Sequence, residues 1–289
     1  MLRLFRALSH LPLGLLQALG ALLGLGVYAA SPTYRRRLRA NLTQAGYGPG
    51  RMALAVAQAT GRMLGEMPFV WFRKGPRAAV HRVRLEGREH VEQAEREGRG
   101  ILYLTPHLGC FEVSAQVAST WGPITVLYRP PRKAWLDALV QARPRGLLRV
   151  APATVAGMRP LLRALRSGEA VGLLPDQAPA AGEGVWAPFF GRPAYTMTLP
   201  ARLVQLTGAR IILAFAERLP RGQGYVLHFR PFEDELPDDP ADAAARINQA
   251  VENLIRMSPE QYLWGYNRYK APPGSMPAPQ PSPAETSPS

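Results

Sequence analysis

Uninterrupted apolar runs alternate with helix-like segments between residues 83 and 257, and this alternation limits the chain to few folds. Most of the runs carry side chains suited to burial on both faces. Strands of a parallel sheet have this composition, because the connecting helices cover both faces of the sheet. We therefore expect an α/β fold with a largely parallel sheet flanked by helices. The predicted strands are residues 83–87, 101–105, 124–128, 170–175, 210–217 and 225–231, and the predicted helices are residues 34–44, 51–72, 89–97, 135–141, 155–166, 197–206 and 241–257, with another starting near residue 109.

A run of twenty residues without a charge, Leu11 to Ala30, lies near the start of the chain. A helix of this length rises about 30 Å, which matches the hydrocarbon core of a membrane. Arginines flank the run on both sides: Arg3 and Arg6 precede it, and Arg35, Arg36, Arg37 and Arg39 follow it.

This run has three possible interpretations. A cleaved signal peptide fits the early arginines, but a basic cluster directly after an apolar run disfavours export. A buried core helix is the second, although four glycines and apolar residues all round are unusual there. We expect the third, an N-terminal membrane-anchor helix within residues 1–40, with the arginine cluster on the cytoplasmic side. Such a helix either spans the membrane or lies in its interface.

The charge and cysteine content limit the partners of the chain. It has 35 Lys and Arg against 21 Asp and Glu, a net charge of +14. This excess predicts an anionic partner, which is nucleic acid, an anionic membrane surface, or an acidic protein or substrate. One cysteine excludes an internal disulfide framework. Residues 271–289 contain seven prolines and are expected to form a disordered tail, which leaves residues 41–270 as the main domain.

Polar side chains directly follow four of the predicted strands. Ligands of open α/β sheets bind beyond the carboxyl ends of the strands. One such residue would indicate little, whereas four indicate a shared polar edge. The residues are His107 after ILYLTP, Arg129 after ITVLY, Asp176 and Gln177 after AVGLLP, and Glu217 and Arg218 after RIILAFA.

The stretch TPHLGCFE places His107 five residues before Glu112. In one continuous helix, residues five apart point about 140° apart, so the two side chains would not meet. They meet if His107 lies in the strand-to-helix turn and Glu112 in the first helical turn. Pro106 and Gly109 have the composition of such a turn. A carboxylate bonded to one ring nitrogen leaves the other nitrogen free to take a proton, which is the arrangement of a general base.

Other interpretations of His107 remain open on spacing alone. A zinc site needs at least three ligands, and the other four histidines show no ligand spacing. Cys110 as a nucleophile would need a nearby base, but it falls where an apolar residue would pack. A structural histidine is the third alternative. The chain has no G-x-S-x-G elbow, Walker A loop or G-x-G-x-x-G loop after any predicted strand.

The pair His107 and Glu112 resembles the H-x4-D/E motif of the glycerolipid and lysophospholipid acyltransferase superfamily. Further blocks resemble, in order, those of the bacterial lipid A biosynthesis acyltransferases, and the likeness extends from the N-terminal anchor to Lys270. The blocks are YRP (128–130), RPRG (143–146), GEAVGLLPDQ (168–177), GVWAPFFGRPAYT (184–196), GARIILAFAER (208–218) and PEQYLWGYNRYK (259–270).

The resemblance implies an enzyme with its catalytic domain, residues 41–270, on the cytoplasmic face of the cell inner membrane. It would move a fatty acyl chain from acyl carrier protein, or from a coenzyme A thioester, to a hydroxyl of a phosphorylated glycolipid. No cofactor, metal ion or nucleic acid is implied.

The resemblance also implies roles for individual residues. His107 would be the general base and Glu112 its orienting partner, with Arg143 and Asp176 as further catalytic residues; Arg145 is the alternative to Arg143. The expected substrate-binding residues are Arg129, Arg145 and Gln177, together with Phe189 and Phe190, which would line an acyl channel or belong to the core.

Two other functions stay open. The first is the same chemistry on a different lipid acceptor, such as a lysophospholipid, an ornithine-type lipid or another glycolipid. The second is a membrane-associated nucleic-acid-binding protein without catalytic activity. The basic residues are scattered and form no recognised nucleic-acid module, which disfavours the second.

Overall fold

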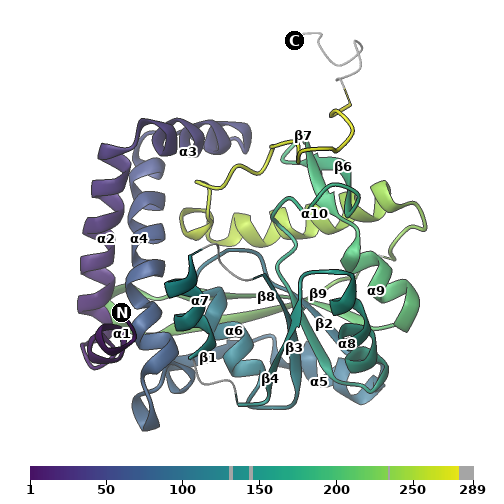
Figure 1. Ribbon diagram of the computed structural model, residues 1–289, viewed down its shortest axis with the longest axis horizontal. Helices are drawn as coiled ribbons and strands as arrows, with labels where there is room; N and C mark the ends of the chain where they lie inside the picture. The colour runs from purple at the N-terminus through teal and green to yellow at the C-terminus, as the bar shows by residue number, and fades with distance from the viewer. Residues whose placement is uncertain (130–132, 143–145, 234, 280–289) are drawn as a thin grey trace.

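The computed structural model describes residues 1–129, 133–142, 146–233 and 235–279, and it shows a sheet covered by helices (Figure 1). Seven strands form the main sheet in the order β1–β9–β8–β2–β5–β3–β4, and β6 and β7 form a separate hairpin. The strands are β1 Val83–Glu86, β2 Ile101–Leu104, β3 Ile124–Tyr128, β4 Leu148–Pro152, β5 Ala170–Leu173, β6 Gly184–Phe189, β7 Arg192–Met197, β8 Arg210–Arg218 and β9 Tyr225–Pro231.

The main sheet is parallel except where β8 meets β9, which confirms the predicted fold class. Six residues join β8 to β9, too few for a crossover, so β9 must return antiparallel. The strand β4 and the β6–β7 hairpin were not predicted. The helices are α1 Leu2–Leu8, α2 Leu13–Ala30, α3 Pro32–Gln44, α4 Arg51–Phe72, α5 Arg88–Glu97, α6 Phe111–Ala118, α7 Ala134–Gln141, α8 Val155–Arg166, α9 Leu199–Thr207 and α10 Pro240–Met257.

The two faces of the sheet belong to two apolar cores. Along β2, Leu102 and Leu104 point to the core that contains residues of α8, α9 and α10. Ile101 and Tyr103 point to the other core, which contains residues of α5 and α6. This alternation follows from the two-residue period of a strand. All four side chains are buried, as expected for a strand near the centre of a sheet.

The helices α2 and α4 lie side by side at the left of Figure 1, and their backbones touch through glycines. A Cβ on Gly20 would lie 2.3 Å from the carbonyl oxygen of Gly61, and a Cβ on Gly61 would lie 2.0 Å from that of Gly20. A Cβ on Gly24 would lie 2.1 Å from the carbonyl oxygen of Ala57. The glycines of the apolar run therefore serve close helix packing within the fold.

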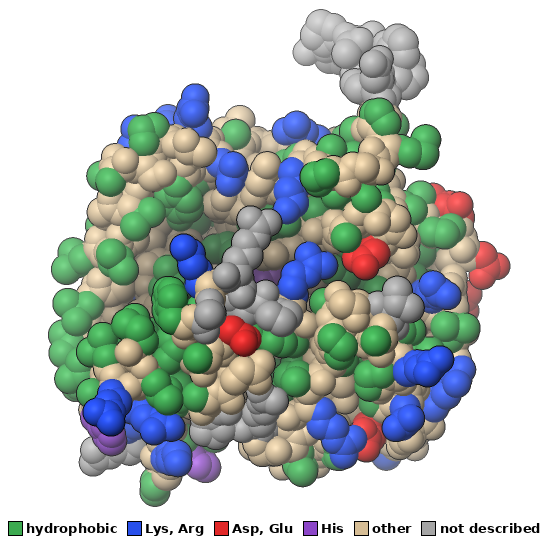
Figure 2. Space-filling model, in the orientation of Figure 1, with side chains coloured by type: hydrophobic (Ala, Val, Ile, Leu, Met, Phe, Trp, Pro, Cys, Tyr) green, Lys and Arg blue, Asp and Glu red, His purple; other side chains and the backbone are tan. Residues whose placement is uncertain are grey.

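One helix among the described residues, Leu13–Ala30, is long and apolar enough to cross a membrane; a third of it is buried against the protein, and core helices and signal sequences meet the same criterion. Its outer face is apolar. Figure 2 shows hydrophobic side chains gathered along the left of the molecule, where α2 and α4 lie. The large apolar side chains exposed on these two helices are Leu15, Leu19, Leu22, Leu23, Val27, Leu54 and Leu64.

The segment after α10 returns across the molecule toward α3 and then to the β6–β7 hairpin (Figure 1). The carbonyl oxygens of Trp264 and Tyr266 accept hydrogen bonds from Asn41 of α3, and Met276 accepts one from the indole of Trp186 in β6. The expected disordered tail, residues 271–289, falls in part on residues 280–289, which lie outside the described residues.

The glycine contacts lead to a stability prediction. Gly20→Ala should lower the free energy of unfolding by about 1–3 kcal/mol, because the added methyl group overlaps the Gly61 carbonyl. Gly26→Ala is the matched control: Gly26 lies on the same helix with no atom within 4 Å of an added Cβ. That change should be neutral or stabilise the helix by about 0.5–1 kcal/mol. Thermal unfolding in detergent micelles compares the two, and equal midpoints would contradict the close packing.

Candidate active site

The turn between β2 and α6, here called the His107 turn (residues 105–110), carries the histidine singled out in the sequence. Gly109 has φ +62°, and a Cβ there would lie 2.0 Å from the carbonyl oxygen of Ala216, so only glycine fits. Backbone hydrogen bonds hold the turn on two sides. Cys110 N–H donates to Ala216 O at 2.8 Å, Gly109 N–H to Gln261 O at 3.1 Å, and Leu263 N–H to His107 O at 3.1 Å.

Asp176 fixes the imidazole of His107 from the neighbouring strand β5. His107 Nδ1 lies 2.8 Å from Asp176 Oδ1, and the His107 backbone N–H donates to Oδ2 at 3.1 Å. Burial raises the pKa of Asp176, but the charge of His107 and its two hydrogen bonds outweigh burial and hold that pKa below its ordinary value. Asp176 is therefore ionised at neutral pH and accepts the Nδ1 proton. This tautomer leaves the lone pair on Nε2.

The free side of the imidazole faces Gln177 and Phe111. Gln177 Nε2 lies 3.1 Å from His107 Nε2, which fits an amide N–H donated to the Nε2 lone pair. The Phe111 ring meets the imidazole edge-on, with centroids 4.9 Å apart. The His107 side chain is 17% exposed, so the imidazole is partly open to solvent. With Nδ1 held by a carboxylate and Nε2 directed to a neutral amide, His107 has the geometry of a general base.

Glu112 lies in the first turn of α6, and its Oε2 accepts a hydrogen bond from the indole of Trp71 at 2.9 Å. The Nδ1 contact expected for Glu112 is made by Asp176 in this structure. The two carboxylates therefore differ in surroundings, and a catalytic part for Glu112 stays a prediction.

The predicted substrate-binding residues are in different places. Gln177 adjoins His107, as described above. Arg129 follows β3, with a side chain 63% exposed and Nη2 4.0 Å from Glu183 Oε2. Arg143 and Arg145 lie outside the described residues, so the choice between them is untested.

Phe189 and Phe190 are buried at the end of β6, in the core beside α10. Phe190 packs against Trp264, with ring centroids 5.4 Å apart. The guanidinium of Arg256 lies over the Phe190 ring, 4.8 Å from its centroid. These contacts are those of core residues. The acyl channel proposed for the two phenylalanines stays a prediction.

A narrow apolar cavity lies beside the His107 turn, and its lining includes Thr105, Phe111, Ser114 and Gly172. Its volume is about 40 Å³, which is room for a water molecule and too little for a fatty chain. Ser114 Oγ lines it and has no hydrogen-bond partner among the described residues. An acyl chain can enter here only if side chains such as Phe111 move.

Cys110, the alternative nucleophile, is buried beneath the turn. Burial raises the pKa of its thiol well above the ordinary value, and the nearby Glu66 carboxylate adds to the increase. Such a thiol is protonated and inaccessible, which excludes it as a nucleophile in this conformation. Among the described residues, no group of three or more His, Cys, Asp and Glu side chains is arranged to hold a metal ion.

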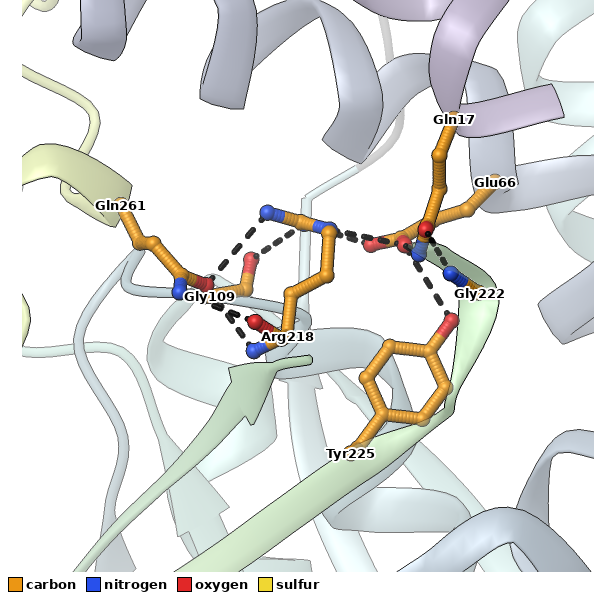
Figure 3. A network of polar contacts seen from close by, with 7 residues as sticks. All are labelled: Gln17, Glu66, Gly109, Arg218, Gly222, Tyr225 and Gln261. Atoms are coloured by element: carbon orange, nitrogen blue, oxygen red, sulfur yellow. Dashed lines mark hydrogen bonds and ion pairs between the residues drawn. The ribbon is translucent and has the colours of Figure 1, made fainter. Parts of the chain in front are cut away.

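The sequence interpretation missed a polar network beside the turn. Glu66 of α4 pairs with Arg218 at the end of β8, and Gln17, Tyr225 and Gln261 join them (Figure 3). Arg218 was recognised as part of the polar edge. The sequence offered one signal for Glu66, which is a single carboxylate in a helix whose buried face is otherwise mostly apolar.

Comparisons with known proteins agree with the sequence resemblance. A family model described as bacterial lipid A biosynthesis acyltransferase matches residues 2–271. The chain is similar to the lipid A biosynthesis acyltransferase of Haemophilus influenzae, with 33% identity over 184 residues, 62% of this chain and 56% of that protein. It is similar to the lipid A biosynthesis lauroyltransferase of Escherichia coli, with 30% identity over 79% of this chain and 74% of that protein. It is also similar to the lipid A biosynthesis palmitoleoyltransferase of Escherichia coli, with 29% identity over 75% of this chain and 70% of that protein.

The lowered pKa of Asp176 leads to a pH prediction. A carboxylate with a lowered pKa stabilises the fold above its unfolded pKa, near 3.8, and loses that contribution as the pH falls through the folded value. The wild type should therefore exceed Asp176→Asn in free energy of unfolding at pH 7, and the difference should shrink as the pH falls below about 4. Urea titrations at several pH values measure it.

The exposed Asp238 provides the control, because Asp238→Asn removes a carboxylate without a buried partner. This variant should follow the wild type at every pH. An Asp176→Asn protein with wild-type stability at pH 7 would contradict the pairing with His107.

Proposed function

The chain belongs to the bacterial lipid A biosynthesis acyltransferase family, and from this premise we propose that it transfers a fatty acyl chain from an acyl thioester to a hydroxyl group of a lipid A precursor. The observation that carries the proposal is the geometry of His107, whose Nδ1 is held by the ionised Asp176 and whose Nε2 faces the amide of Gln177. A hydroxyl is a poor nucleophile at neutral pH, so its acylation needs such a base.

The acceptor hydroxyl takes the place of the Gln177 amide at Nε2 and gives its proton to this nitrogen as the oxygen attacks the thioester carbonyl. The Asp176 carboxylate stabilises the imidazolium that forms. The tetrahedral intermediate collapses as the carbon–sulfur bond breaks, and the imidazolium proton passes to the departing thiolate. The displaced Gln177 amide is a candidate donor to the oxyanion, and one such donor is worth about 3–4 kcal/mol.

The transfer is direct, from donor to acceptor within one complex. The single cysteine is buried and protonated, which leaves no thiol to carry the acyl group. The donor is acyl carrier protein or a coenzyme A thioester, and the acceptor is a phosphorylated glucosamine disaccharide. Both are anionic, which suits a net charge of +14. Arg129 at the polar edge is a candidate contact for an acceptor phosphate.

The protein acts at the cytoplasmic face of the inner membrane. The exposed leucines of α2 and α4 supply an apolar face for the lipid chains. At the base of these helices, a basic cavity of about 640 Å³ is lined by residues that include Arg6, His10, Arg73 and Lys74. Basic side chains beside an apolar face fit the anionic headgroups of a membrane surface.

The test supplies the purified full-length protein with an acyl carrier protein thioester and, separately, a diphosphorylated tetraacyl glucosamine disaccharide or a lysophospholipid. We expect mass spectrometry to find one added acyl chain on the disaccharide and none on the lysophospholipid. A coenzyme A thioester in place of the carrier protein identifies the donor. Transfer to the lysophospholipid alone would contradict the proposed acceptor, and transfer to neither would contradict the proposed function.

A further inference from the structure

A buried ion pair lies directly beneath the His107 turn, between α4 and the end of β8 (Figure 3). Arg218 Nε lies 2.8 Å from Glu66 Oε2, and Arg218 Nη2 lies 2.5 Å from Oε1. The side chains are 4% and 1% exposed. Desolvation of two charges offsets most of their attraction, so a buried pair contributes mainly through what it holds in place.

The further contacts of this ion pair reach four other segments. Glu66 Oε2 also accepts hydrogen bonds from Gln17 at 3.0 Å and from the Tyr225 hydroxyl at 3.2 Å. Arg218 Nη2 also donates to the Gly109 carbonyl oxygen at 3.2 Å, and Nη1 donates to Gln261 Oε1 at 3.5 Å. The pair therefore connects α2, β9, the His107 turn and the segment after α10.

The contact with Gly109 acts on the backbone two residues after His107. It pulls the turn onto β8, while the Ala216 carbonyl oxygen, 2.0 Å from where a Cβ of Gly109 would lie, sets the limit of approach. Gln261 also fixes the turn, because its backbone oxygen accepts a hydrogen bond from Gly109 N–H. Its side chain bonds to the Arg218 backbone at both ends: Oε1 accepts from Arg218 N–H at 2.9 Å, and Nε2 donates to Arg218 O at 3.1 Å. The position of the turn thus depends on Arg218 directly and through Gln261.

Gln17 brings the N-terminal helix into the same network. It is 4% exposed, and its amide is satisfied at both ends: Nε2 donates to Glu66, and Oε1 accepts from the Gly222 backbone N–H at 3.2 Å. A buried amide costs free energy unless it is bonded. In the otherwise apolar helix α2, Gln17 is therefore the residue that bonds to Glu66, the carboxylate that pairs with Arg218.

We propose that Glu66 and Arg218 are positioning residues for His107, and that Gln17 couples the seating of α2 to the geometry of the His107 turn. The kinetic consequence rests on the acyl transfer proposed above, whereas the structural consequence does not. When α2 is displaced, Glu66 loses the Gln17 donor, and the positions of Arg218 and of the Gly109 carbonyl are then less firmly fixed.

The first test is Arg218→Lys, studied in the full-length protein. Lysine keeps the charge, but one ammonium group cannot reproduce the planar fork that reaches Glu66, Gly109 and Gln261 together. Because small misplacement of a base is costly, kcat should fall at least about tenfold while KM for both substrates stays within about twofold. Amide hydrogen exchange in the peptide covering residues 105–112 should rise.

The same strand offers a matched control. Arg210, at the other end of β8, also pairs with a glutamate through two contacts, to Glu97 at 2.5 and 3.2 Å, but its side chain is 50% exposed. Arg210→Lys should leave kcat, KM and the exchange of residues 105–112 at their wild-type values. Arg210→Lys thus shows whether the effect of Arg218→Lys is specific to the Arg218–Glu66 pair or follows from altering any arginine–glutamate pair of β8.

The second test is Gln17→Leu, which keeps the ion pair and decides the question if Arg218→Lys does not fold. It should produce the same pattern, a fall in kcat with unchanged KM and faster exchange at residues 105–112. Gly26→Ala, at an exposed position of the same helix with no atom within 4 Å of an added Cβ, is its control and should change neither.

Wild-type kcat and wild-type exchange of the turn in Arg218→Lys and Gln17→Leu would overturn the proposal. So would a loss of activity that only follows the loss of folded protein, with unchanged exchange at residues 105–112. If the wild type transfers no acyl chain to any acceptor, the proposed function fails, and the exchange measurement still decides whether these residues position the turn.

Discussion

The candidate site of this protein lies at the carboxyl ends of three neighbouring strands. Because β2 lies between β5 and β8, the segments that follow these strands meet at one edge of the sheet. The His107 turn follows β2, and it is contacted by Asp176, which follows β5, and by Arg218 at the end of β8. No pair among these residues is close in sequence. The order of the strands is therefore the constraint on which the candidate site depends.

The elements of the fold that have a clear hydrophobic periodicity could be predicted from the sequence. The apolar strands and most helices were predicted within a few residues, because buried strands and amphipathic helices differ in composition. β4 was missed because Arg149 and Pro152 interrupt its apolar character. The β6–β7 hairpin was missed because Pro188 and Pro193 face each other in it, and proline is tolerated only in edge strands such as these.

For the candidate site, the sequence predicted several of the residues but not which of them contact each other. The polar residues after the strands were recognised, and Asp176 and Gln177 do adjoin His107. Their contact depends on β5 lying next to β2, which no local pattern in the sequence reports. Glu66 was missed for a related reason: it lies on a helix 152 residues from its partner Arg218, and only tertiary packing brings the two charges together.

The N-terminal helix combines two properties that the sequence interpretation treated as alternatives. Its outer face exposes leucines, as a membrane-associated helix does, while its inner face packs on α4 through glycines and sends Gln17 into the buried network. A helix bound in this way is connected to the His107 turn through Gln17, Glu66 and Arg218.

The central claim is that His107 acts as the base of acyl transfer. Its most direct test is single-turnover transfer from an acyl carrier protein thioester to the tetraacyl disaccharide by folded His107→Ala, with folding confirmed by circular dichroism. The account predicts a rate at least about 100-fold below that of the wild type, since the acceptor hydroxyl then has no base. A folded His107→Ala protein that transfers the acyl chain within a few-fold of the wild-type rate would contradict it.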